Sequence, residues 1–162
     1  MTTDVATPGR EFARRFLNTL CELRLQQGIH RRIETIANDF AMEHPNVRAM
    51  YVSREVDDCY FEDPLLPPGA AARPRMHGIA IDGEQLYEFV AFSHGLRTDV
   101  VGLSSIVSIE ETWTEPSPET PFVFRVVMTH TPAGATVLLA TTGETQDAVR
   151  DFVGRIKYLK GW

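Results

Sequence analysis

The chain has 162 residues, 43% of them apolar, which is enough for one substantial core and too few for two ordinary domains. Its 22 acidic side chains outnumber its 16 basic ones and give a formal net charge of −6. This balance argues against a nucleic-acid-binding protein, because phosphate contacts need a basic surface. No apolar run approaches the length of a membrane span, and residues 1–9 lack a signal-peptide core, so we expect a cytoplasmic protein.

Residues 1–45 have the period of helices. The apolar positions form two faces. The first consists of Phe12, Phe16, Leu17, Leu20 and Cys21, and the second consists of Ile29, Ile33, Ile36, Ala37 and Phe40. Gly28 separates them, so either a helical hairpin or one kinked helix fits, and His44-Pro45 ends the second run. This N-terminal helical extension must pack on the following sheet or on another chain, in which case its first face would mediate self-association. Its arginines, Arg15 among them, have acidic neighbours and fit a solvated surface.

From residue 47 the apolar period changes to two, as expected for strands. The runs with this pattern are residues 47–54, 57–63, 75–81, 84–93, 97–103, 105–114, 122–130 and 135–141. The first two read as a strand pair around Glu55-Val56, although no strong turn dipeptide joins them. Residues 64–74 are rich in proline and predict a loop. From these eight runs we expect about seven strands.

An amphipathic helix follows the last strand, over residues 144–160. Val149, Phe152, Val153 and Ile156 fall at i, i+3, i+4 and i+7 and form one apolar stripe that needs a cover. Thr142 is the expected N-cap and Gly161 the expected end. The charged residues Asp147, Asp151 and Arg155 lie on the opposite face and read as solvated.

Three segments carry a resemblance to a known superfold. They are GEQLYEFVAFS at 83–93 followed by GLR at 95–97, VGLSSIVSIE at 101–110, and LLATT at 138–142 leading into DAVRDFV at 147–153. Together with the strand order, they resemble the pleckstrin-homology-like (PH-like) modules, which include PH, GRAM, PTB and EVH1 domains. The resemblance covers roughly residues 47–160. It implies an α+β fold in which residues 46–162 form an antiparallel seven-stranded barrel or sandwich capped by the C-terminal helix.

The resemblance also implies where a partner would bind. PH-like modules that recognise proteins or peptides accept them in a groove between the fifth strand and the C-terminal helix. The corresponding residues here are Ile106, Ser108, Glu110 and Trp113 on the strand and Arg150 and Tyr158 on the helix. We therefore expect a noncatalytic interaction or scaffolding module that binds a protein or peptide.

Phosphoinositide-binding PH domains provide an alternative. The resemblance then implies a basic cluster for a lipid headgroup at a membrane, for which the candidates are Arg54, Arg73, Arg75 and Arg97. Acidic residues are interspersed among them and oppose a polyanionic ligand. The lysine-rich signature of those domains is also absent.

A third alternative is an enzyme. The stretch YFEDP at 60–64, after two helical runs, resembles NTF2-like and SnoaL-like folds, whose pocket hosts acid–base chemistry. Asp63 would be the base, with His77 or His94 near it. Those folds usually end in long strands, whereas this chain ends in a helix.

The sequence otherwise contains little that suggests catalysis. Cys21 and Cys59 are far apart, and the five histidines lack the spacing of a metal site. Glycine-rich phosphate loops and a nucleophile elbow are missing. We therefore expect no catalytic residue, no metal and no cofactor.

Overall fold

The fold begins with two separate helices, as one of the two sequence interpretations predicted. The computed structural model describes residues 6–56, 73–114, 123–132 and 134–162. Helix α1 spans Pro8–Glu22 and helix α2 spans Gln27–Glu43, and the two pack against each other. Arg24 between them has a positive φ of 52°, so the chain reverses there in a turn rather than a kink.

Seven described strands form two antiparallel sheets. The first sheet has the order β1-β2-β3-β4, with β1 at Ala49–Ser53, β2 at Met76–Asp82, β3 at Gln85–Phe92 and β4 at Gly95–Gly102. The second has the order β5-β6-β7, with β5 at Ile106–Thr114, β6 at Val123–His130 and β7 at Ala135–Ala140. The predicted strand at 57–63 lies outside the described residues, as does Cys59. The described partner of β1 is β2.

These strands do not close into a barrel. After β4 the chain makes a short 3-10 turn, η2 at Leu103–Ser105, and β5 then pairs with β6 and not with β4 in the described residues. The α+β class and the terminal helix were predicted correctly. The closed barrel is not found, because the turn at Leu103–Ser105 takes the chain from one sheet to the other.

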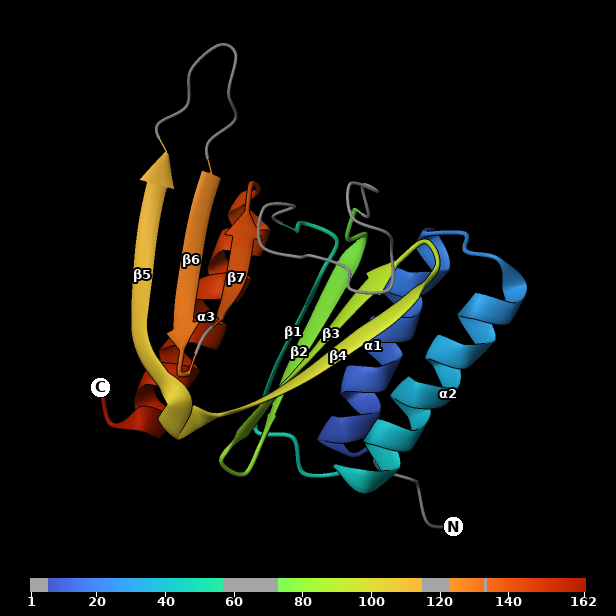
Figure 1. The fold of residues 1–162 in the computed structure, drawn as a ribbon, viewed down its shortest axis with the longest axis horizontal. Coiled ribbons are helices and arrows are strands. Elements are labelled where there is room, and N and C mark those ends of the chain that lie inside the picture. Colours follow the sequence, from blue (N-terminus) through green and yellow to red (C-terminus); the bar gives the residue numbers. More distant parts are fainter. Residues whose placement is uncertain (1–5, 57–72, 115–122, 133) are drawn as a thin grey trace.

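The terminal helix α3, Gly143–Lys160, runs alongside the second sheet and overlaps it in the view of Figure 1. It contacts both β1 and β7, the strands at either end of the meander. Its N-cap is Thr142, whose Oγ1 accepts a hydrogen bond from the Thr145 N–H at 3.1 Å, and Gly161 ends it with φ of 73°, as predicted. At its end, Lys160 Nζ donates to the Leu103 carbonyl at 2.6 Å. The helix is thus fixed to the turn that joins the sheets.

The core between the sheets receives the apolar stripe of α3. The buried side chains include Tyr51, Ile79, Ile81 and Leu86 from the first sheet, Phe124, Val126, Met128 and Leu138 from the second, and Val149, Phe152, Val153 and Ile156 from α3. The predicted helix stripe is therefore buried as a unit. It covers apolar surface that neither sheet buries alone.

The other face of the first sheet is covered by α1 and α2 (Figure 1). Phe12, Phe16 and Leu20 of α1 are at most 1% exposed and pack with Phe89 of β3 in one cluster. Most of the predicted apolar face of this helix therefore packs on the sheet of the same chain, whereas Cys21, which was assigned to that face, is exposed. Gly78 on β2 permits this close approach, since a Cβ there would lie 2.5 Å from Phe16 Cδ2.

Among the described residues, none of the helices combines the length and apolar character needed to cross a bilayer.

Candidate functional site

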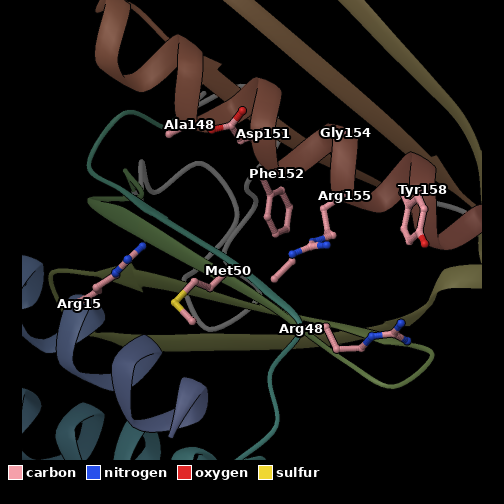
Figure 2. Close-up of a pocket in the computed structure, with 10 residues that line it drawn as sticks. Arg15, Arg48, Met50, Ala148, Asp151, Phe152, Gly154, Arg155 and Tyr158 are labelled. Carbon is pink, nitrogen blue, oxygen red and sulfur yellow. The ribbon is translucent and has the colours of Figure 1, made fainter. Parts of the chain in front are cut away.

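A groove runs along β1 between α1 and α3 (Figure 2). It consists of two adjoining cavities of about 560 and 310 Å³ that share Arg15, Met50 and Ala148. The larger cavity is lined by Arg15, Arg48, Ala49, Met50, Ala148, Asp151, Phe152, Gly154, Arg155 and Tyr158. The smaller is lined by Arg15, Asn18, Thr19, Met50, Tyr51, Val52 and Ala148. Together they follow β1 from Ala49 to Val52.

The floor of the groove is the edge of a sheet. In the described part of the chain, β1 pairs with β2 on one side and has no strand on the other. An edge strand presents a row of unpaired backbone N–H and C=O groups, which is a template for a further strand. Within the described residues, this edge of β1 is therefore open to backbone hydrogen bonds, with a helix on either side.

The α1 wall is positioned by the same amphipathic pattern that builds the core. Thr7 caps the helix by accepting a hydrogen bond from the Arg10 N–H at 3.2 Å, and Phe12 and Phe16 bury the face toward the sheet. Arg15, Asn18 and Thr19 then lie on the flank beside β1. Their placement follows from the helix period.

The α3 wall arises in the same way. Phe152 is 3% exposed in the core, while its helical neighbours Ala148 and Arg155 remain accessible at the groove. Figure 2 shows Arg155 extending from α3 into the space beside β1. The face of α3 that the sequence predicted to be solvated is therefore one wall of the groove.

The charged lining is mainly basic, in a chain whose net charge is −6. Arg48 and Arg155 are exposed and form no ion pair with a described residue. Arg15 is bound by Glu11, with Nε 3.0 Å from Oε1, and hydrogen bonds from Arg14 and Arg15 lower the pKa of Glu11 to about 2. Asp151 is the acidic residue in the lining. The groove therefore suits an anionic ligand.

The residues predicted to bind a partner do not gather in one cavity. Ile106 is buried in the core at 1% exposure, Ser108 is half-buried and Glu110 is exposed on β5. Tyr158 is 75% exposed and lines the groove beside β1. Between β5 and α3, Lys157 Nζ lies 3.4 Å from an oxygen of Glu111, so a salt bridge connects the two elements there.

Trp113 and Arg150 do come together. The Trp113 ring stacks on Phe124 with a centroid distance of 4.0 Å, and the Arg150 guanidinium lies 4.5 Å above the Trp113 ring. Trp113 remains 40% exposed. This cation–π stack joins β5, β6 and α3, with the Phe124 ring buried beneath Trp113.

The four arginines considered for lipid binding have local partners or no shared pocket. Arg54 lies 3.4 Å from Glu22 and Arg97 lies 3.1 Å from Asp99. Arg75 donates to Ser93 Oγ at 3.4 Å, and Arg73 is exposed. None of the four lines the described groove.

The residues considered for acid–base chemistry are dispersed. Asp63 lies outside the described residues, and His94 is exposed beside Phe92. His77 is fully buried next to the Tyr51 ring, and burial lowers the pKa of His77 to about 4. No group of His, Cys, Asp and Glu in the described ranges has the arrangement of a metal site.

Sequence reasoning missed a buried carboxyl in the first sheet. Glu88 on β3 is 3% exposed and lies directly opposite the core residue Ile79 of β2. Its Oε2 has no hydrogen-bond partner among the described residues, and burial raises the pKa of Glu88 to about 7. The signal in the sequence was a glutamate within a strand that is otherwise apolar.

Comparisons of the chain with protein-family models, with curated proteins and with solved structures found no match.

Proposed function

We propose that the chain is a noncatalytic, cytoplasmic protein-interaction module that binds an extended acidic segment of a partner protein along β1. One observation carries the proposal: within the described residues, the free edge of β1 forms the floor of a groove in which Arg48 and Arg155 have no ion pair. An extended segment would add a strand to the sheet, and its acidic side chains would meet these guanidinium groups.

The order of the elements supports a fold related to the PH-like modules, which remains part of the proposal. Seven antiparallel strands precede one amphipathic helix, and that helix packs against the first and last strands. The proposed binding surface differs from the one first expected, because it uses the opposite flank of α3, beside β1 rather than β5.

The test is a selection from a display library of random peptides on the immobilised full chain, followed by titration of the selected peptides. We expect acidic, β-prone sequences. Arg48→Glu and Arg155→Glu should each weaken peptide binding by about fivefold or more, because an arginine that attracts the acidic side chains of the peptide is replaced by a glutamate that repels them. Arg32→Glu on the exposed face of α2 is the matched control and should bind like the wild type.

A second variant tests the groove by shape. Ala148 is exposed where the two cavities meet, so Ala148→Trp should fill the groove without disturbing the core. Thermal unfolding confirms that each variant is folded. If selected peptides bind all folded groove variants as tightly as the wild type, β1 is not the binding site and the proposal is wrong.

A further inference from the structure

The two ends of the groove differ in charge. The end beside the start of β1 contains Arg48, Arg155 and Tyr158, whereas the end beside Val52 contains the uncharged polar residues Asn18 and Thr19. The two possible directions of a ligand strand in the groove are therefore not equivalent.

The arginine in the middle does not cancel this asymmetry. Arg15 is shared by both cavities, but its guanidinium is already bound to Glu11 at 3.0 Å. Asp151 lies one helical turn before Arg155 on α3 and would repel an acidic side chain placed toward the middle. The favourable position for negative charge is thus the Arg48 end.

The strand-pairing geometry, together with this difference in charge, predicts the chain direction of the bound ligand. All described pairs in the first sheet are antiparallel, and antiparallel pairing is the more stable arrangement per residue. An antiparallel ligand runs against β1, so its C-terminal end lies beside the N-terminal end of β1, where Arg48 is found. β1 has five residues, so it pairs with about 16 Å of ligand.

We infer that the ligand is an extended segment with acidic residues at its C-terminal end, preceded by small or hydroxyl-bearing residues that lie beside Met50, Val52 and Thr19. This inference rests on the proposed function and specifies the ligand of the same groove. Small residues fit there because the smaller cavity holds about 310 Å³ between two helices.

The test uses two synthetic peptides of identical composition with both termini blocked, so that only side-chain charge differs in position. One has glutamates at the C-terminal end of a threonine- and valine-rich strand, and the other has the reversed sequence. Fluorescence anisotropy titrations with the full chain should give about tenfold tighter binding for the first peptide. In the Arg48→Glu/Arg155→Glu double variant this preference should disappear, while Arg32→Glu should keep it.

The outcomes separate the two proposals. Equal binding of both peptides, lost in Ala148→Trp, would overturn the inferred direction and leave the groove as the binding site. Tighter binding of the reversed peptide would also overturn it, because the ligand would then run parallel to β1. If both peptides and the library-selected peptides bind Ala148→Trp as well as wild type, the proposed function itself fails.

Discussion

Glu88 is a carboxyl group that the fold keeps away from water. Burial is the main cause of its raised pKa, the charge of Asp99 adds to the effect, and the charge of Arg97 opposes it. The pKa of this carboxyl is about 7 in the folded chain and about 4.5 in the unfolded chain, so between these pH values it takes up a proton on folding. Its contribution to stability is therefore complete below about pH 4.5 and is lost as the pH rises through about 7.

Glu88→Gln tests this pH dependence, because glutamine resembles the neutral carboxyl at every pH. As the pH rises from about 5 to about 8, the wild type should lose stability that the variant keeps. The free energy of unfolding of the variant should therefore increase relative to that of the wild type by up to about 3 kcal/mol. Urea unfolding at the two pH values measures the difference, with exposed Glu84→Gln as the control. A stability difference that is the same at both pH values would contradict the buried, proton-binding role of Glu88.

Gly78 is the residue that lets α1 approach the sheet. A Cβ at this position would lie 2.5 Å from Phe16 Cδ2 and 3.1 Å from Phe12 Cζ, both on buried rings that have little room to move. Gly78→Ala should therefore lower the free energy of unfolding by about 1–3 kcal/mol. Chemical denaturation measures it, and an unchanged midpoint would mean that α1 does not pack as closely as described.

At the scale of elements, α3 offers a substitution of the opposite sign. Gly154 lies in the helix interior, and a Cβ there would meet nothing within 4 Å. Gly154→Ala should stabilise the protein by about 0.5–1 kcal/mol, since alanine is the better helix former and restricts the unfolded chain. The same denaturation experiment compares it with Gly78→Ala, and a loss of stability would show that the groove wall tolerates no added methyl group.

Phe152 connects α3 to the core and should be the most costly position on that helix. Its side chain is 3% exposed, and its ring centroid lies 6.0 Å from that of Tyr51. Phe152→Ala should cost about 3–5 kcal/mol, whereas Tyr158→Ala, at a position that is 75% exposed, should cost far less. Thermal or urea unfolding of both variants checks the contrast, and similar costs would mean that α3 is not held by this stripe.

The elements themselves were largely predictable from the sequence. Alternating apolar residues at 84–93 and 135–141 predicted β3 and β7 to within two residues, and the Val149, Phe152 stripe predicted α3 with both of its caps. The period of two at 105–114 likewise predicted β5. It did not predict that β4 and β5 belong to different sheets, because that separation depends on the turn at Leu103–Ser105 rather than on either strand.

The groove could not be predicted in this way, because no local pattern contains it. Its arginines come from α1, from the residue before β1 and from α3, at positions 15, 48 and 155. Each reads as an ordinary solvated charge within its own segment. They face one groove only because α1 and α3 pack on opposite flanks of the same edge strand, which is a property of the assembled molecule.

At the scale of the whole molecule, the described residues form two large cores that share the first sheet, beside a small cluster of Val90 and Phe92. One face of that sheet packs on α1 and α2, and the other packs on α3 and the second sheet. Helices α1 and α2 therefore cover one face of β2, whose first six residues are all buried. The helical extension thus shares a hydrophobic core with the first sheet.

Deletion of residues 1–45 should therefore abolish the native fold of residues 46–162. The deletion would expose Met76, Ala80, Phe89 and Ala91, which are at most 6% exposed in the full chain. A contiguous apolar sheet face of this kind promotes aggregation in a soluble chain. We expect the truncated chain to elute as large aggregates in size-exclusion chromatography and to lose cooperative thermal unfolding by circular dichroism. The full chain, measured by the same two methods, is the control and should unfold cooperatively without such aggregates. A monomeric fragment with a sharp unfolding transition would show instead that residues 46–162 are an autonomous domain, and that α1 supplies the groove wall without being needed for the sheet to fold.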